Sequence, residues 1–387
     1  MVITGLENIV ASGFKGLKGK SLAVISNQSA VDRNLTHLIE HISENRLRLK
    51  AVLAPEHGFF ASVQDMAAVS DDERNGIAFY SLYGKNFESL SPTDEMLDEI
   101  ECLIFDIQDV GSRYYTFAAT LALAMKKASE LGIEVVVLDR PNPVNLADIE
   151  GFTVEKGFES FVGLLPVPNR HGFTVGELAL FANDKLSLGC NLKVVPCKGL
   201  NRRMWFDETK LPWVLPSPNM PTPDTAAVYP GMCLIEGTNL SEGRGTTRPF
   251  ELFGAPFLNG VKLRNRLNDF NLEGVAFRPV EFIPMFQKHS GAVCGGVQIH
   301  ITERNLFKPF KTGVAALIAS RELGGDKFKW RTEEYEFVSD IPAIDLLAGS
   351  DYLRKMIERG ATLDEIAAHY APFERRFSKE KEAYHLY

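Results

Sequence analysis

The segment APEHGF, residues 54–59, places an acid and a histidine at the end of a run of apolar residues. Such a run predicts a buried strand. Glu56 would then lie half-desolvated at the strand tip, where the pKa of a carboxyl rises and the group can act as a general acid. We therefore predict Glu56 and His57 as catalytic residues, with His57 orienting Glu56 or bonding a backbone carbonyl. The alternative is that Glu56 only caps the next helix.

A second polar cluster lies in FDIQDVGSRYYT, residues 105–116. Asp106 and Asp109 could bind a metal ion, sugar hydroxyls or the backbone amides of the following helix. Arg113 is suited to a substrate carboxylate because its planar guanidinium can form two parallel hydrogen bonds with one. Tyr114 could stack on a sugar ring or pack in the core. We retain all four as predicted substrate-binding residues.

Two more segments carry polar side chains beside residues that stiffen or cap the backbone. In DRPNP, residues 139–143, prolines on both sides of an asparagine fix its direction. In RHGFTVGELA, residues 170–179, Thr174 and Glu177 have the spacing of a capping box, so we expect Glu177 to be structural. The substrate-binding candidates in these two segments are Asp139, Arg140, Asn142, Arg170 and His171.

The densest polar stretch is EGTNLSEGRGTTRPFE, residues 236–251. Its glycines predict a loop that approaches a ligand with its backbone, although no phosphate-loop signature occurs in it. Carboxylates combined with Arg, Asn and aromatic residues suit carbohydrate chemistry, since glycosidases typically need one protonated and one ionised carboxyl group. We predict Glu242 as catalytic, and the predicted substrate-binding residues are Glu236, Asn239, Ser241, Arg244 and Thr246.

The elements that must position these residues alternate between apolar runs and helical patterns. Such alternation predicts parallel strands covered on both faces, so the expected fold class is α/β. In such sheets ligands bind at the carboxyl ends of the strands, which is where four polar clusters fall in succession. The predicted strands with their loops are 21–27, 49–58, 102–111 and 133–143, and the predicted helices are 35–46 and 116–132.

The composition changes near Leu200, and residues 211–231 are rich in Pro, Ser, Asn and Thr. This stretch predicts an ordered connection between two domains rather than a helix. It also holds Asn219, a further substrate-binding candidate. We expect a first domain over residues 1–225 and a second, smaller domain over residues 226–387.

The composition is that of a globular protein, with 45% hydrophobic and 24% charged residues in a chain of 387. The net charge of -8 argues against nucleic acid as a partner. Five scattered cysteines form no metal-binding or redox motif, and we expect neither a metal nor a cofactor. Since no signal peptide and no apolar stretch of about 20 residues is present, we expect a cytoplasmic protein without a membrane span. No coiled-coil seam argues for more than a monomer or weak homodimer.

The chain resembles the exo-β-N-acetylmuramidase family. The resemblance implies a Rossmann-like N-terminal catalytic domain, a smaller α/β (α+β) C-terminal domain and an active site in the cleft between them. It also implies hydrolysis that removes N-acetylmuramic acid from the non-reducing end of peptidoglycan-derived saccharides or muropeptides. Seven segments carry it in family order: APEHGF, SLYG at 81–84, FDIQDVGSRYYT, VLDRPNP, RHGFTVGELA, PSPNMPTPDTAAVYPG and EGTNLSEGRGTTRPFE.

The resemblance also bears on individual residues. Glu56 matches the glutamate of the family's PEHG motif, and the lactyl carboxylate of muramic acid would meet Arg113, Arg170 or Arg244. Two departures concern substrate contacts. Residues 60–69 read FASVQDMAAV where relatives have a loop rich in Arg, Gly, Asp and Ala, and Val144-Asn145 replaces a glycine pair.

Three alternatives remain open at the level of sequence. The partner of Glu56 could be one of several carboxylates (Glu242, Glu236, Asp106 or Asp109) or the substrate's own acetamido group. A metal-dependent hydrolase or esterase could use Asp106, Asp109, His57 and Asp139, and it would lose activity with a chelator. A non-catalytic amino-sugar-binding protein could keep the cleft without turnover.

Overall fold

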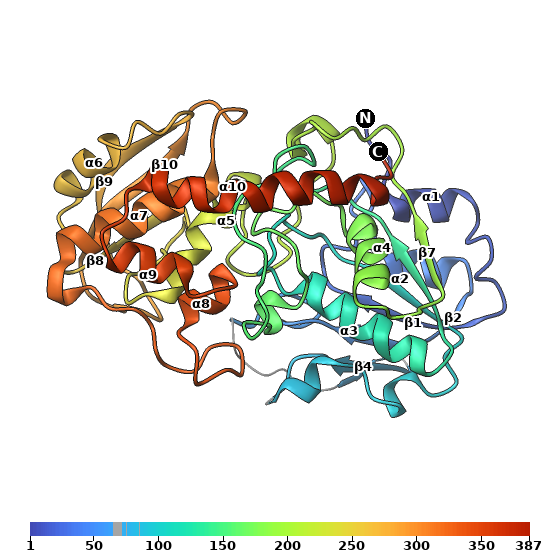
Figure 1. The fold of residues 1–387 in the computed structure, drawn as a ribbon. Helices are drawn as coiled ribbons and strands as arrows, with labels where there is room; N and C mark the ends of the chain where they lie inside the picture. The colour runs from blue at the N-terminus through green and yellow to red at the C-terminus, as the bar shows by residue number, and fades with distance from the viewer. Residues whose placement is uncertain (65–71, 75, 85) are drawn as a thin grey trace.

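The computed structural model describes residues 1–64, 72–74, 76–84 and 86–387, and they form two halves that lie side by side in Figure 1. In this described part, the first half contains a seven-stranded sheet with the order β3-β4-β2-β1-β5-β6-β7. Six of these strands are parallel, and β3 pairs antiparallel with β4 at one edge. The strands are β1 (Ser21–Ser26), β2 (Arg48–Ala54), β3 (Asp72–Arg74), β4 (Ile77–Ser81), β5 (Cys102–Asp106), β6 (Glu134–Leu138) and β7 (Leu192–Val195). The predicted α/β class is confirmed.

The central strands β1 and β5 are buried along their whole length, because both faces of the sheet are covered there. In β1, Leu22 and Val24 belong to one buried cluster with residues of α1 and α2, while Ala23 and Ile25 belong to another with residues of α3. Helix α4 packs against α3 on the second face. The helices of this half are α1 (Gly5–Ala11), α2 (Leu38–Glu44), α3 (Phe117–Glu130) and α4 (Val175–Lys185).

The second half is built on a three-stranded antiparallel sheet with the order β8-β10-β9, and α6 packs against its β9 and β10 strands. Helices α5 and α7 approach closely at Gly231 and Gly313, since a Cβ atom at Gly231 would lie 1.8 Å from the carbonyl oxygen of Pro309. The elements are α5 (Pro223–Met232), β8 (Leu252–Ala255), α6 (Gly260–Asn268), β9 (Val275–Phe282), β10 (Cys294–Ile301), α7 (Pro309–Gly324), α8 (Ala343–Ala348) and α9 (Tyr352–Glu358).

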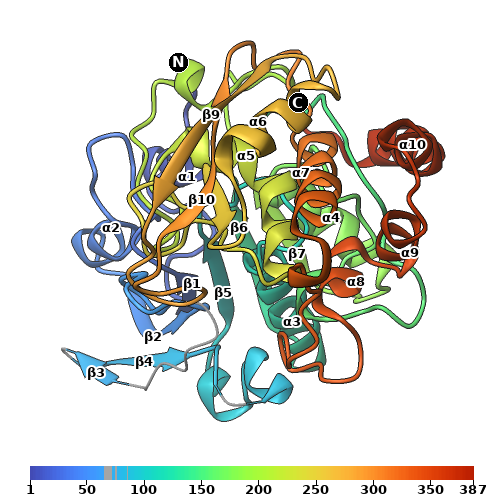
Figure 2. The ribbon, with the colours of Figure 1, turned by 90° about the vertical axis from the view of Figure 1, so that its left-hand side faces the viewer.

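The last helix, α10 (Leu363–Glu380), runs from the second half back across the first (Figure 1) and is seen end on in Figure 2. The residues after it pack against the first half. The Lys381 ammonium donates to the carbonyl oxygen of Gly172 at 2.8 Å, and the Tyr387 hydroxyl donates to Asp139 at 2.5 Å. The end of the predicted second domain therefore belongs structurally to the first half.

The predicted boundary between residues 225 and 226 falls inside α5. The predicted connection, residues 211–231, is ordered, but the prediction that it contains no helix is wrong because its second part forms most of α5. The part before α5 lies against the carboxyl end of β1. There the Asn27 amide donates to the carbonyl oxygen of Pro216 at 2.9 Å, and Gln28 donates to Leu215 at 2.9 Å. In the part of the chain that is described, no helix is long and apolar enough to cross a membrane.

Candidate active site

Two adjoining recesses share one lining residue; the inner one is lined by both halves and the outer one by the second half alone. The inner recess is narrow, with a volume of about 40 Å³, and its lining includes Glu56, Tyr115, Asn219, Tyr229, Arg244 and Tyr335. The outer recess is open, with a volume of about 640 Å³, and its lining includes Glu242, Lys288, His289, Lys329, Trp330 and Arg331. Glu236 lines both recesses.

Glu56 reaches the inner recess because it directly follows the buried strand β2 and precedes a tight turn. The turn holds His57 and Gly58 with positive φ angles of 72° and 77°. Only 4% of Glu56 is exposed, and the Thr116 hydroxyl donates to its Oε2 at 2.7 Å. His57 places Nδ1 2.9 Å from the carbonyl oxygen of Val63. It therefore fixes the turn that carries Glu56.

Glu236 lies at the junction of the two recesses with both carboxylate oxygens engaged. Arg244 contacts Oε1 at 2.6 Å, and the Tyr335 hydroxyl donates to Oε2 at 2.7 Å. The guanidinium of Arg244 also lies over the ring of Phe250, with its carbon 5.1 Å from the ring centroid. These contacts hold a negative charge at a fixed position between the recesses.

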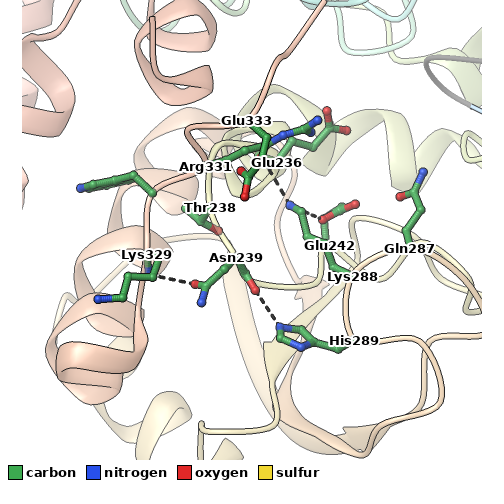
Figure 3. Close-up of a pocket in the computed structure, with 11 residues that line it drawn as sticks. Glu236, Thr238, Asn239, Glu242, Gln287, Lys288, His289, Lys329, Arg331 and Glu333 are labelled. Atoms are coloured by element: carbon green, nitrogen blue, oxygen red, sulfur yellow. Dashed lines mark hydrogen bonds and ion pairs between the residues drawn. The ribbon is translucent and has the colours of Figure 1, made fainter. Parts of the chain in front are cut away.

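Glu242 lines the outer recess beside Lys288 (Figure 3) and contacts two cations in all. Lys288 Nζ lies 3.0 Å from its Oε2, and Arg244 Nε lies 3.4 Å from its Oε1. Lys288 is fixed further by the carbonyl oxygens of Ile235 and Glu236, at 3.2 and 3.3 Å. Glu242 is thus a buried counter-ion for both cations, which is how proteins accommodate a buried carboxylate.

The rest of the outer recess is held together through Asn239 (Figure 3). Its side chain accepts from the backbone amide of Lys329 and donates to the carbonyl oxygen of Lys327, both at 2.9 Å. Its own carbonyl oxygen lies 2.7 Å from Nε2 of His289. The predicted residue Asn239 therefore lines the recess, but its amide is used to join two loops.

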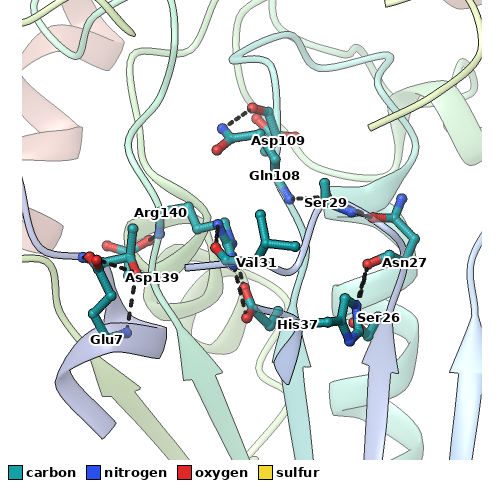
Figure 4. Close-up of polar contacts among 12 residues, drawn as sticks. Glu7, Ser26, Asn27, Ser29, Val31, His37, Gln108, Asp109, Asp139 and Arg140 are labelled. Carbon is teal, nitrogen blue, oxygen red and sulfur yellow. Dashed lines mark hydrogen bonds and ion pairs between the residues drawn. The ribbon is translucent and has the colours of Figure 1, made fainter. Parts of the chain in front are cut away.

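The other predicted strand-end residues contact one another or nearby backbone groups (Figure 4). Asp106 is fully buried and forms a two-point ion pair with Arg140, at 2.5 and 3.0 Å. Asp109 accepts from the Gly111 amide at 2.7 Å, and burial raises its pKa to about 7. Asp139 accepts from the Gly176 amide at 2.7 Å. None of these four predicted residues lines either recess, and we correct their assignment to structural roles.

Asp139 illustrates the reason for this correction. It accepts a hydrogen bond from the Thr174 hydroxyl at 2.8 Å as well as from Gly176, and so it anchors the start of α4. Burial raises its pKa to about 6. Glu177 forms the predicted capping box with Thr174, so its structural role is confirmed. At the carboxyl ends of β1, β5 and β6, polar side chains satisfy the backbone of neighbouring loops instead of a ligand.

Three further predicted residues, Asn142, Arg170 and His171, are likewise buried inside the protein. The amide of Asn142 donates to the carbonyl oxygen of Phe173 at 2.9 Å. Arg170 is fully buried and pairs with Glu150 at 2.8 Å, and burial lowers the pKa of His171 to about 3. These three residues also lie outside both recesses and are reassigned to structural roles.

Arg113 does not meet a substrate carboxylate. Its guanidinium donates to three backbone carbonyl oxygens, those of Phe152 at 2.5 Å, Val167 at 3.0 Å and Leu347 at 2.6 Å. Tyr114 lines the inner recess with its ring, but its hydroxyl donates to the carbonyl oxygen of Pro230. The guanidinium groups of Arg113 and Arg170, both predicted to bind the lactyl group, are buried in internal contacts.

The glycines of residues 236–251 approach protein rather than a ligand. A Cβ atom at Gly243 would lie 2.6 Å from the carbonyl oxygen of Leu252, and one at Gly245 would lie 2.7 Å from the Met285 amide. Both residues have positive φ angles, 81° and 77°. The predicted ligand-binding residues Ser241 and Thr246 bond within the loop, to the backbone of Gly243. The loop is compact so that its charged residues stay in place.

The metal-dependent alternative required four side chains at one point. The structure separates them: Asp106 pairs with Arg140, Asp139 anchors α4, Asp109 binds the Gly111 amide and His57 binds the Val63 carbonyl. Within the described ranges, no group of three or more His, Cys, Asp or Glu side chains is arranged to hold a metal ion. The predicted contacts of residues 65–69 lie outside the described residues.

Several residues of the recesses were not predicted from the sequence. Lys288-His289 and Lys329-Trp330-Arg331 come from segments without glycine-rich or strand-end motifs. The only signal was the grouping of basic and aromatic residues in each segment. The unpredicted residues of the inner recess include Thr116, Ser217, Met220, Tyr335 and Glu336.

The sequence matches the models of the two domains of one known family over nearly its whole length. The family model described as exo-β-N-acetylmuramidase NamZ, N-terminal, matches residues 22–224, and its C-terminal counterpart matches residues 227–387. The peptidoglycan β-N-acetylmuramidase NamZ of Bacillus subtilis (strain 168) is 44% identical over 389 residues, covering 100% of this chain and 91% of that protein.

Two solved structures of DUF1343 family proteins from Bacteroides fragilis NCTC 9343 have the same fold. One superposes with a TM-score of 0.88 at 34% identity, and the other with 0.79 at 31%. Each comparison covers 100% of this chain and 99% of the solved one. With carboxyl groups and aromatic rings gathered between two α/β halves, the chain is a glycoside hydrolase. It belongs to the exo-β-N-acetylmuramidase NamZ family.

Proposed function

We propose that the chain hydrolyses the glycosidic bond of N-acetylmuramic acid at the non-reducing end of small peptidoglycan-derived saccharides. The observation that carries the proposal is Glu56, a buried carboxyl at the tip of β2 in a narrow recess beside a wider, open one. A narrow recess that adjoins a wider one suits an enzyme that removes a terminal sugar. The relative from Bacillus subtilis, named a peptidoglycan β-N-acetylmuramidase, supports the substrate class.

In this proposal Glu56 is the general acid. Its proton passes to the glycosidic oxygen as the bond to the anomeric carbon breaks, so the leaving sugar departs with a neutral hydroxyl. Glu56 then removes a proton from the water that attacks the anomeric carbon. The Thr116 hydroxyl orients the carboxyl by donating to Oε2.

Glu236 is the second carboxylate. It lies at the junction of the recesses with Arg244 and Tyr335 at its two oxygens, so it can face the positive charge that develops at the anomeric carbon. We assign the predicted catalytic residue Glu242 a different role, because it lines only the outer recess, whereas Glu236 also lines the recess that holds Glu56. Glu242 positions the two cations that contact its oxygens, Lys288 and Arg244.

The lactyl carboxylate of muramic acid meets the cations of the outer recess. Arg331 and Lys329 line this recess, and the Arg331 guanidinium also donates to the carbonyl oxygen of Glu334 at 3.1 Å. A guanidinium binds a carboxylate through two parallel hydrogen bonds, and a lysine adds a point charge. Arg331 therefore replaces Arg113 and Arg170 in our assignment.

We also propose that the chain divides into two domains between residues 225 and 226. The matches of the two family models to residues 22–224 and 227–387 support it. Residues 381–387 would then be an extension of the second domain that packs on the first. The monomer or weak homodimer and the cytoplasmic location stay predictions, to be tested by sedimentation and by cell fractionation.

The proposal is tested with a chromogenic β-N-acetylmuramide and the matching β-N-acetylglucosaminide. Wild-type protein should release the chromophore from the muramide, and Glu56→Gln should lower that rate at least a thousandfold while the thermal midpoint stays unchanged. Glu44→Gln is the matched control, because Glu44 is an exposed residue on α2. No release by folded wild-type protein, combined with binding of N-acetylmuramic acid, would instead favour the non-catalytic sugar-binding alternative.

A further inference from the structure

The Tyr115 hydroxyl is buried without a partner. Tyr115 lines the inner recess and is only 6% exposed, yet its oxygen has no hydrogen bond of normal geometry to any described residue. Buried hydroxyl groups in folded proteins are nearly always hydrogen-bonded, so an exception that lines a recess is a donor available to a ligand or a water molecule there. The neighbouring Tyr114 shows the usual situation, because its hydroxyl donates to the carbonyl oxygen of Pro230.

The ring of Tyr115 is held in one position by other aromatic rings. Phe117 packs edge to face against it with ring centroids 4.8 Å apart, and Tyr229 does the same at 5.7 Å. Such contacts leave the ring little freedom to turn the hydroxyl toward a protein acceptor. The hydroxyl is therefore fixed before any ligand arrives.

The hydroxyl also remains a donor at neutral pH. Burial raises the pKa of Tyr115 well above its usual value, and the opposing effect of the nearby Ser217 is smaller. A protonated phenol donates one hydrogen bond and can satisfy a carbonyl oxygen.

The size of the inner recess limits which part of a sugar it can receive. A volume of about 40 Å³ has room for about three water molecules, which is too small for a pyranose ring. An acetamido group has four heavy atoms and is of that size. Val162, Met220 and Phe250 give the recess apolar walls, which suit a methyl group, while Tyr115 supplies a donor for a carbonyl oxygen. The wider outer recess, at about 640 Å³, has room for the ring.

We propose that the inner recess receives the acetamido group of the substrate and that the Tyr115 hydroxyl donates a hydrogen bond to its carbonyl oxygen. The inference rests on the proposed function and deepens it by assigning one substituent to one recess. Glu236, which lines both recesses, would then lie beside the bond between the acetamido group and the ring. Tyr115 is a binding residue in this assignment, and it makes the site selective for N-acetylated sugars.

The test compares Tyr115→Phe with wild-type protein in the binding of N-acetylmuramic acid and of muramic acid, which lacks the acetyl group. Titration calorimetry should show the Kd for N-acetylmuramic acid raised about tenfold in Tyr115→Phe, the usual effect of one lost hydrogen bond. The Kd for muramic acid should change less than twofold. Tyr114→Phe is the matched control: it removes the adjacent hydroxyl, and the ratio of the two Kd values should stay at the wild-type value.

Two results would overturn the inference. In the first, Tyr115→Phe weakens the binding of both ligands equally. In the second, it weakens the binding of neither ligand although the thermal midpoint shows an intact fold. Because the readout is binding, it separates the inference from the proposed hydrolysis. If wild-type protein hydrolyses the muramide and Tyr115→Phe binds both ligands as wild-type protein does, only the inference is contradicted. Selective binding without any turnover supports the inference and contradicts the hydrolysis.

Discussion

At the scale of single residues, the same side-chain types serve catalysis and structure, and their partners decide between the two. Asp106 and Glu236 are both buried carboxylates that pair with an arginine. Asp106 lies beneath the loops at the end of β5, whereas Glu236 lines two recesses. Removing a charge from a buried pair leaves the other charge uncompensated, so each pair is fixed strongly once it forms.

We expect Arg331→Gln to raise the KM for the β-N-acetylmuramide about tenfold with a small effect on kcat. The change removes the charge that binds the lactyl carboxylate, and a charge-assisted hydrogen bond contributes about 1.5–3 kcal/mol. The KM for the β-N-acetylglucosaminide should change less than twofold because it has no lactyl group. Arg203→Gln is the surface control. An equal rise in KM for both substrates would show that Arg331 does not bind the lactyl carboxylate.

At the scale of elements, α10 and the residues after it fasten the second half to the first. Lys381 lies at the start of this tail, is buried, and donates to the carbonyl oxygens of Leu146 and Gly172. Burial, followed by the nearby Arg202, lowers the pKa of Lys381 to about 7 from 10.5. The tail is therefore attached by a lysine that loses its proton in the folded state at moderately alkaline pH.

This lysine predicts a pH dependence of stability. Between pH 7 and 10.5 the unfolded chain binds up to one more proton at Lys381 than the folded chain, so the unfolding free energy rises with pH by at most about 1.4 kcal/mol per unit. Lys381→Met removes this contribution. Chemical denaturation should show wild-type stability increasing relative to Lys381→Met by about 2 kcal/mol from pH 7.5 to 9.5. A difference that is the same at both pH values would contradict the assignment.

At the scale of the whole molecule, buried hydrogen bonds join the halves on which the cleft depends. Arg113 and Asn169 of the first half both donate to the carbonyl oxygen of Leu347 on α8, at 2.6 and 2.9 Å. The amide of Glu155 donates to Gly349 at 2.8 Å. Because these contacts are internal and satisfied, the two halves should unfold together.

We expect Arg113→Met to lower the unfolding free energy by about 3 kcal/mol, because three buried hydrogen bonds to backbone carbonyl oxygens are lost. Denaturation monitored by circular dichroism should still show one transition. The KM values for the muramide and the glucosaminide should keep their ratio, with Arg203→Met as the control. Unchanged stability with a higher KM for the muramide alone would restore the substrate-binding role predicted from the sequence.

The elements near the site were largely predictable because their signals are local. The predicted strand 21–27 is β1 (Ser21–Ser26), and the predicted helix 116–132 is α3 (Phe117–Glu130). The capping box of Thr174 and Glu177 was also read from spacing alone. The recess-lining carboxyls Glu56, Glu236 and Glu242 were identified, since each lies in a dense polar segment. Arg113, Arg170 and Asp139 could not be separated from them, because a sequence does not show which polar groups face each other.

The sequence by itself determined the α/β class, the family and the motifs that contain the recess-lining carboxyls Glu56 and Glu236, because apolar periodicity and motif spacing are properties of neighbouring residues. Only the tertiary structure decided which motifs meet. The connection before α5 lies against the carboxyl end of β1, where Asn27 and Gln28 bind its backbone. Residues 287–289 and 329–331 complete the outer recess although nothing local marks them. These outcomes depend on contacts between distant segments, which form only when the chain folds.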